Sequence, residues 1–152
     1  MPHNVFVAEF IGAPKMNLMQ TELVQEGGKY FVTPFGAKIE VTGDKAEGLK
    51  QKGIGNRKIL LGGRPEHIVL ADQPGLDAIP CKLEVNEMMG SELHLHVYTA
   101  DETRLIVRVP TINLTSEQRK AMVYGAQLYI TFEGKVMHFF DKDSSLNLIY
   151  GD

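Results

Sequence analysis

The feature that most constrains the fold is the spacing of the apolar residues, which from Met16 onward recur at every second position in short runs. These runs occupy residues 17–24, 29–33, 37–42, 79–86, 92–98, 104–109, 128–132 and 136–140, and residues 147–150 could add one more. Alternation places successive side chains on opposite faces of a strand, so each run predicts a strand with one buried face. Short strands separated by Gly and Pro predict a mainly β fold, a barrel or sandwich, and argue against parallel βαβ units.

The start of the chain lacks this alternation and predicts a short helix over residues 4–11. Asn4 is placed to cap the first turn, and Pro14 follows the end. Phe6 and Phe10 are four residues apart and therefore lie on one face of this helix. A helix of this length is marginal alone, so we expect both rings to pack against another surface, part of which lies upstream of the first residue.

A second helix is predicted over residues 119–124. Thr115 and Gln118 match a capping box, in which each side chain bonds the backbone N–H of the other residue. The polar connection at 43–55 mixes basic and acidic residues without aromatic ones, and we interpret it as a solvated loop with one possible helical turn around 46–51.

A stiff corner is expected where the apolar strand that starts at Ile59 ends. Pro65 fixes its own φ and favours an extended Arg64. On extended backbone Arg64 and Glu66 point to the same side, because they are two residues apart. Two interpretations stay open at this point: a surface ion pair worth about 0–1 kcal/mol, or a clamp at an interface.

A β-hairpin is expected between residues 79–86 and 92–98, with its turn at 88–91. We expect Gly90 in this turn to adopt a positive φ, which a side chain would resist. Two of the seven methionines lie at this tip, and we interpret the methionines as core filler rather than as a binding surface.

The composition argues against several classes of function. A net charge of −3, a pI near 5.9 and the absence of tryptophan argue against a nucleic-acid-binding protein, which usually has a basic face. No apolar run reaches the roughly 18 residues that a membrane helix requires. The single cysteine, Cys81, rules out an internal disulfide and fits a reducing compartment.

No motif for catalysis or metal binding is complete. Gly43 and Gly48 have the spacing of a phosphate loop, but the lysine is out of place, so the chain is not expected to hydrolyse ATP unaided. His94 and His96 could reach one metal from a strand, but without an assured third ligand we expect them on its polar face. Asp141 starts a partial calcium-loop pattern that lacks the required glycine. We therefore predict no catalytic residue, no bound cofactor and no metal ligand.

Several stretches are more specific when they are taken together. Residues 4–17 have the sequence NVFVAEFIGAPKMN, the corner is GRPEH at 63–67, and EMMGSE, HFFD and NL occur at 87–92, 138–141 and 147–148. In this order they resemble the C-terminal part of the ATPase subunits of MalK-like carbohydrate ABC importers. The matching motif positions are Phe10, Gly12, Pro14, Asn17, Arg64, Pro65, Glu66, Gly90 and Glu92.

The resemblance implies an OB-like barrel or sandwich with a TOBE lobe and two short helices. Residues 1–14 would end the linker helix of a nucleotide-binding domain, 15–72 would form the OB-like lobe, and 73–152 would form the TOBE lobe. Residues 133–152 could return to the first lobe. The ATPase half is absent from this sequence, so we expect a fragment that begins just before the junction.

For function, the resemblance implies a regulatory and dimerisation domain that is not catalytic alone. In the family two such domains pair and keep the ATPase subunits together, and some bind regulatory proteins. The expected partners are a second copy, the nucleotide-binding domain and, indirectly, the membrane subunits, at the cytoplasmic face of the cell membrane. This context favours an interface role for Phe6, Phe10, Arg64 and Glu66. ATP and Mg would bind only the missing domain.

One alternative function stays open: a sensor of small oxyanions or metabolites, with Arg64 as a candidate ligand-binding residue. No nucleic-acid partner is expected.

Overall fold

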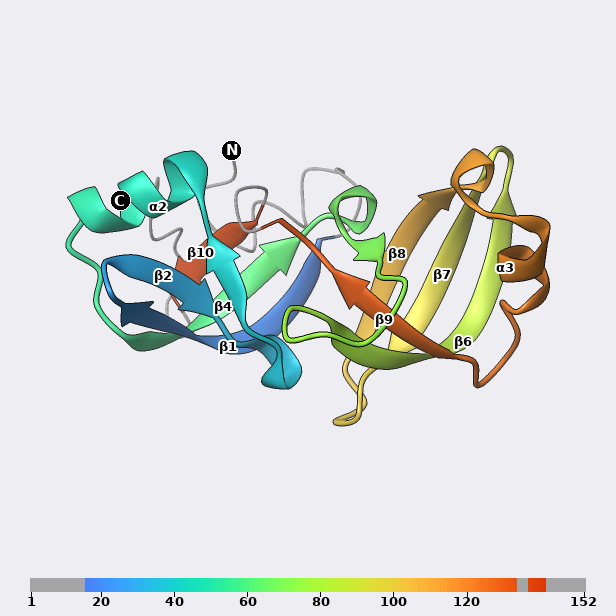
Figure 1. The fold of residues 1–152 in the computed structure, drawn as a ribbon, viewed down its shortest axis with the longest axis horizontal. Coiled ribbons are helices and arrows are strands. Elements are labelled where there is room, and N and C mark those ends of the chain that lie inside the picture. Colours follow the sequence, from blue (N-terminus) through green and yellow to red (C-terminus); the bar gives the residue numbers. More distant parts are fainter. Residues whose placement is uncertain (1–15, 134–136, 142–152) are drawn as a thin grey trace.

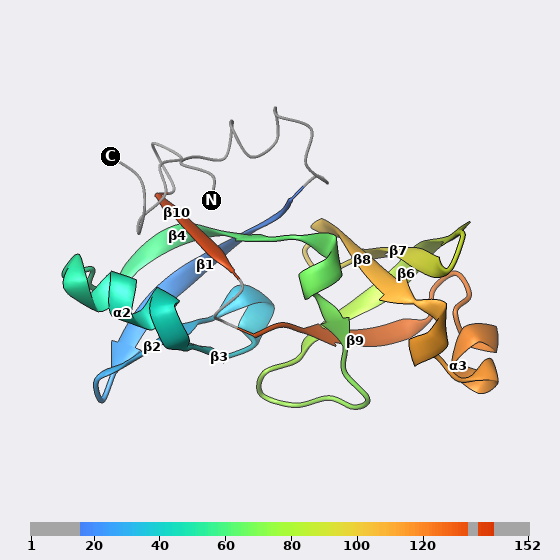
Figure 2. The same ribbon diagram turned by 90° about the horizontal axis from the view of Figure 1, so that it is seen from above.

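A computed structural model describes residues 16–133 and 137–141, which form two antiparallel sheets placed end to end (Figures 1 and 2). The first sheet has the order β10-β4-β1-β2-β3 and the second the order β5-β9-β6-β7-β8. The strands of the first are β1 (Asn17–Glu26), β2 (Lys29–Val32), β3 (Ile39–Val41), β4 (Arg57–Gly63) and β10 (His138–Asp141). Those of the second are β5 (Val69–Leu70), β6 (Ile79–Met89), β7 (Glu92–Tyr98), β8 (Arg104–Pro110) and β9 (Gln127–Thr131).

The period of two in the sequence matches the burial of these strands. Along β7, for example, Leu93, Leu95 and Val97 are buried, and the residues between them are partly exposed. The expected mainly β, OB-like fold is confirmed, and both sheets are open rather than closed into barrels. The helix predicted at 4–11 and the strand predicted at 147–150 lie outside the described residues.

Two α-helices and three short 3-10 turns complete the described part of the chain. They are η1 (Pro34–Gly36), α2 (Gly43–Gln51), η2 (Pro65–His67), η3 (Thr111–Asn113) and α3 (Ser116–Lys120). The capping box is confirmed: Gln118 N–H donates to Thr115 Oγ1 at 3.1 Å, and Thr115 N–H donates to Gln118 Oε1 at 2.8 Å. Because Thr115 is the cap residue, α3 begins at Ser116, directly after it. The helix ends at Lys120, four residues earlier than predicted.

The interpretation of residues 43–55 as a solvated loop is wrong, whereas the helical turn expected around 46–51 is confirmed and is part of a longer helix. Most of this connection is the helix α2, and Lys45 and Leu49 on it are buried. Burial lowers the pKa of the Lys45 ammonium to about 8. The expectation for the methionines is correct for one group and not for the other. Met16, Met19, Met122 and Met137 are buried in the core as expected, whereas Met88 and Met89 at the hairpin tip are exposed.

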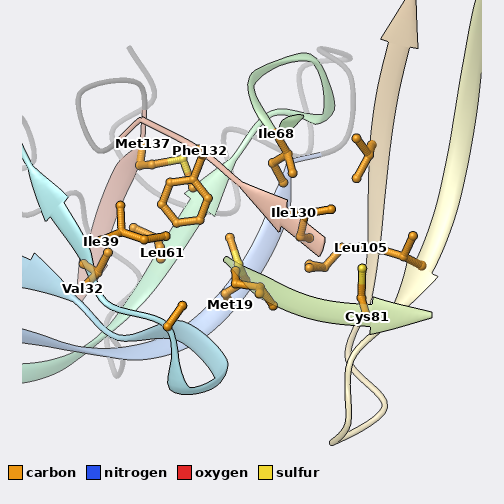
Figure 3. Packing of buried hydrophobic residues seen from close by; sticks show 14 of the residues in the cluster. Met19, Val32, Ile39, Leu61, Ile68, Cys81, Leu105, Ile130, Phe132 and Met137 are labelled. Carbon is orange, nitrogen blue, oxygen red and sulfur yellow. The ribbon is translucent and has the colours of Figure 1, made fainter. Parts of the chain in front are cut away.

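One continuous hydrophobic core joins the two sheets. Met19 of β1 and Leu61 of β4 belong to the same cluster as Leu105 of β8 and Ile130 of β9, and Figure 3 shows these side chains meeting between the sheets. The chain also crosses between them twice. β5 follows the corner and pairs with β9 in the second sheet, and β10 returns to pair with β4 in the first. The two lobes are therefore packed as one body.

Candidate functional site at the seam between the sheets

The backbone of the corner after β4 agrees with the prediction at Arg64 and Pro65 but differs from it at Glu66. Arg64 is extended, with φ −71° and ψ 145°, and Pro65 is buried. Glu66, however, belongs to the 3-10 turn η2 and not to extended backbone, so the extended geometry expected to place it beside Arg64 is not formed. No Arg64–Glu66 ion pair is found. Glu66 approaches Arg108 of β8 instead, with 3.7 Å between its Oε1 and the arginine Nη1.

Arg108 links two of the residues that the sequence singled out. Its Nη2 lies 2.9 Å from Glu92 Oε1 and 3.2 Å from Oε2, while Nη1 approaches Glu66. His94 Nε2 lies 3.2 Å from the same Glu92 oxygen. We call Glu66, Arg108, Glu92 and His94 the seam cluster, because they connect the corner with strands β7 and β8.

The electrostatics of the seam cluster favour an ionised Glu92. Hydrogen bonds from His94 and Arg108, together with their charges, lower the pKa of the Glu92 carboxyl. The three charged side chains are each about one third exposed, so solvent screens the pairs and each contributes modestly. The arrangement holds η2, β7 and β8 together, and it contains no nucleophile paired with a general base.

Asn17, another predicted motif residue, joins the two sheets directly. Its Nδ2 donates to the Ile106 carbonyl at 2.7 Å, and its Oδ1 accepts from the Ile106 N–H at 2.7 Å. Ile106 lies on β8, the edge strand of the second sheet, so the amide of Asn17 completes hydrogen bonds that an edge leaves open. Asn17 is buried. The Asn17 side-chain amide thus bonds the edge of the second sheet as the backbone of a neighbouring strand would.

A cleft of about 320 Å³ lies beside the seam cluster, between the corner and the end of β8. Glu66, Arg108, Asp72 and Gln118 give it polar walls, and Leu114 is one of its apolar residues. Its size and mixed lining suit a small polar molecule. No group of three or more His, Cys, Asp or Glu side chains suited to a metal occurs in residues 16–133 and 137–141.

The two strand histidines lie on the polar face of β7, as expected. Each has a carboxylate neighbour: Glu92 for His94 and Glu87 for His96. Gly90 has a φ of +67° and open space around its Cα, so the turn conformation and not a close approach requires glycine there. The remaining predicted interface residues, Phe6, Phe10, Gly12 and Pro14, lie outside the described residues.

A second group of basic residues lies near Arg64 and was not predicted. His138 of β10 is buried, and burial, with the positive charges of Lys45 and Arg64, lowers its pKa to about 4. Among the described residues neither the Nδ1 of His138 nor that of His67 has a hydrogen-bond partner. No single-sequence signal places these residues together, because β10 comes near the corner only by returning to pair with β4, where His138 lies opposite Gly62.

None of the helices in the described part of the chain is long and apolar enough to cross a membrane.

Comparison with known proteins identifies both lobes. Residues 12–68 match the MalK OB fold domain, and residues 61–140 match the TOBE domain. The chain is 40% identical over 111 residues to an uncharacterized ABC transporter ATP-binding protein, YurJ, of Bacillus subtilis, covering 71% of this chain and 30% of that protein. It is 32% identical to the sn-glycerol-3-phosphate import ATP-binding protein UgpC of Burkholderia cenocepacia, covering 94% of this chain and 36% of that protein.

More distant similarities agree with these matches. The oligosaccharides import ATP-binding protein MsmX of Bacillus subtilis is 27% identical over 97% of this chain and 38% of its own length. The chain thus spans about a third of the length of these relatives. The fold is similar to that of the cytoplasmic molybdate-binding protein ModG, with a TM-score of 0.62 and 10% identity over 86% of this chain and 97% of that one. The resemblance stated from the motifs is confirmed: the chain belongs to the TOBE domain family and carries a MalK-type OB fold domain ahead of its TOBE domain.

Proposed function

We propose that this chain is the C-terminal regulatory and dimerisation domain of the ATPase subunit of a carbohydrate ABC importer. The observation that carries this proposal is the paired OB and TOBE match, which runs along nearly the whole chain and corresponds to about a third of proteins described as import ATP-binding proteins. ATP and Mg would bind the nucleotide-binding domain of the parent protein. The parent would act at the cytoplasmic face of the membrane, in contact with the membrane subunits through its other domain.

The mechanism we propose is tethering. When two such domains stay paired, each nucleotide-binding domain meets its mate at an effective concentration on the order of millimolar, so the halves can separate in every cycle without losing each other. A tether of this kind works best as a rigid body. The shared core, the Asn17 bridge and the seam cluster all favour rigidity across the two lobes.

Pairing is tested most directly by sedimentation velocity of the chain over a range of concentrations. We expect a reversible dimer that Phe10→Ser and Arg64→Glu each weaken, because both residues belong to the predicted interface. Lys52→Glu, an exposed charge change on the C-terminal side of α2, is the matched control and should leave the dimer unchanged. A chain that stays monomeric up to about millimolar concentration, well above the Kd of any stable dimer, would contradict the tethering role.

The second candidate function is a small-ligand sensor, and one observation favours it. Arg64, His67 and His138 place cationic and imidazole groups in one region, and two buried ring nitrogens there have no partner among the described residues. The fold is also shared with a protein that binds molybdate. An oxyanion bound in this region would raise the pKa of His138 by offsetting the positive charges around it.

The sensor function is tested by thermal shift with molybdate, sulfate, phosphate and sugar phosphates. A ligand at a hundred times its Kd should stabilise the chain by about 2.7 kcal/mol. His138→Gln should abolish this stabilisation, and Lys120→Gln at an exposed position of α3 should not. The absence of any shift at millimolar ligand would refute the sensor function and would leave the tethering proposal in place.

A further inference from the structure

Exposed apolar side chains gather at the end of the second sheet that is farthest from the first. Six of the eight large hydrophobic residues that are exposed among the described residues belong to the β6–β7 hairpin or to the segment between η3 and β9 that packs beside it (Figure 1). They are Val85, Met88, Met89, Ile112, Val123 and Tyr124. Ile112 is 90% exposed and Tyr124 is 78% exposed.

Backbone hydrogen bonds hold these elements next to one another. Thr111 N–H donates to the Ser91 carbonyl at 2.9 Å and fixes η3 against the hairpin turn. Asn86 Nδ2 donates to the Met122 carbonyl at 3.3 Å, and Gly125 N–H donates to the Leu83 carbonyl at 2.7 Å. These bonds fix the hairpin, η3 and the segment before β9 against one another. The ladder places Met88 on the face of Leu93 and places Val85 and Met89 on the opposite face with His96 and Glu92, so Met88 is the exposed hairpin side chain that lines the groove described next.

A groove of about 340 Å³ runs between the hairpin and α3. Met88 lies directly opposite Leu93 in the β6–β7 ladder, so both occupy the face that continues the core, yet Met88 is 54% exposed because the core ends there. Leu93 is buried and belongs to the core, whereas Asn86 and Ser116 add polar groups to the lining. We call this cavity the hairpin groove; it is lined by Asn86, Met88, Leu93, Ser116, Arg119 and Lys120.

The rim of the hairpin groove is basic. Arg119 and Lys120 form the last turn of α3, both are exposed, and neither takes part in an ion pair within the part of the chain that the structure describes. Glu117 on the same helix does not line the groove, and Glu87 on the hairpin is engaged by His96. An apolar groove with two free cations at its edge is complementary to a segment with an apolar face and acidic flanks.

We infer that the hairpin groove binds an acidic amphipathic segment of a regulatory protein. The inference rests on the regulatory part of the proposed function and specifies where the regulator docks and what chemistry it presents. Met88 suits this role, since its unbranched, polarizable side chain adapts to different apolar partners.

Two other occupants fit the groove less well. A second copy of the chain related by a two-fold axis would bring Arg119 and Lys120 of each copy towards those of the other, and like charges oppose such contact. A lipid surface is favoured by a broad basic face, whereas this chain has a net charge of −3 and only two cations line the groove. Both occupants become outcomes of the test.

The test uses the whole chain and a synthetic peptide in which Leu recurs at helical spacing and Glu fills the other positions. The matched probe replaces every Glu by Lys. Binding is measured by fluorescence anisotropy of the labelled peptide and located by amide chemical shifts of the chain. The groove variants are Met88→Ser and Arg119→Glu, both at exposed positions, and the matched controls are Leu76→Ser and Lys52→Glu, which are exposed but distant.

We expect the Glu peptide to bind and to shift the amides around Met88, Leu93 and Arg119. Each groove variant should weaken binding by about tenfold or more, while both controls and the melting temperature stay unchanged. The inference would be overturned if the Lys peptide bound equally well, if the shifts mapped elsewhere, or if no binding occurred at about 1 mM peptide. Preferential co-sedimentation with anionic vesicles, or a weaker dimer in Met88→Ser, would overturn it in favour of a lipid or a second copy.

Sedimentation of the same samples separates this inference from the proposed tethering. A monomeric chain that binds the Glu peptide would refute pairing alone, and a dimeric chain that ignores the peptide would refute the groove alone.

Discussion

Replacing Asn17 by Ala should remove a direct polar link between the two lobes. The variant loses two hydrogen bonds of 2.7 Å and leaves the Ile106 N–H and carbonyl without a partner at a partly buried edge. Each bond is worth about 1 kcal/mol net, and orphaned backbone groups add to the loss, so we expect the free energy of unfolding to fall by about 2–4 kcal/mol. Against a typical stability of about 5–15 kcal/mol, such a change is large.

Urea unfolding followed by circular dichroism measures this loss, with Gln20→Ala at an exposed position of the same strand as the control. Amide hydrogen exchange adds a local measurement, since the Ile106 amide should lose protection more than those of Leu105 and Val107 on either side. Asn17→Asp keeps the acceptor for the Ile106 N–H but sets an anion against the Ile106 carbonyl, so it should recover part of the loss when acid protonates it. A change below about 0.5 kcal/mol in Asn17→Ala, the size usual for surface substitutions, would refute the bridging role.

Three further predictions concern the seam cluster, the buried histidine and the glycines at the end of β4. Because the folded-state pKa of Glu92 is lowered, ionised Glu92 stabilises the fold above its unfolded-state pKa, and this stabilisation is lost as pH falls through the folded-state pKa. In urea unfolding measured at several pH values, Glu92→Gln should reduce the fall in the free energy of unfolding at acid pH. An unchanged fall would contradict the assignment. The pKa of His138 is about 4 in the folded state and 6.5 ordinarily, so between pH 6.5 and pH 4 the unfolded state binds more protons than the folded state. The free energy of unfolding should therefore fall by roughly 3 kcal/mol as pH decreases through this range. His138→Gln should abolish this contribution, and a His138 pKa near 6.5 measured by NMR would refute the prediction. A Cβ at Gly62 would meet Met16 Sδ and lie 2.9 Å from the Phe140 ring, so Gly62→Ala should cost about 1–3 kcal/mol. A Cβ at Gly63 would lie 2.6 Å from the terminal methyl of Met137, the flexible end of a side chain, and at ordinary contact distance from Ile68, so Gly63→Ala should cost less; equal thermal shifts would count against this packing.

The strands and the second helix could be predicted from the sequence because local rules decide them. Alternation along 92–98 and 104–109 follows from burying one face, and the Thr115–Gln118 capping box fixes where α3 begins. The helix α2 was underestimated because Gly43 and Gly48 lower its helix propensity and few apolar residues mark its face. Packing against the rest of the fold stabilises it instead.

The site was only partly predictable because its contacts connect distant parts of the chain. Glu66, Glu92 and Asn17 were singled out by resemblance, but their partners were not. The β7–β8 ladder places Arg108 opposite His94 and Glu92 opposite Pro110, so Glu92 and Arg108 are diagonal neighbours, and their contact depends on a register that the sequence did not predict. The Asn17–Ile106 link spans 89 residues, and no local pattern reports a contact of that separation. An interface role for Arg64 stays a prediction, because no described contact concerns a second chain.

The pairing of β10 with β4 determines how this unit would respond to force. β1 and β10 flank β4, and both run antiparallel to it, with Asn17 opposite Gly63 and Asp141 opposite Ile59. A pull on the start of β1 and the end of β10 therefore slides the three strands along one another and loads their ladder bonds together in shear, instead of opening them one at a time. The second sheet lies outside this load path. Tension applied at these two points would pass through three strands of the first sheet, and the β6–β7 hairpin lies outside that path.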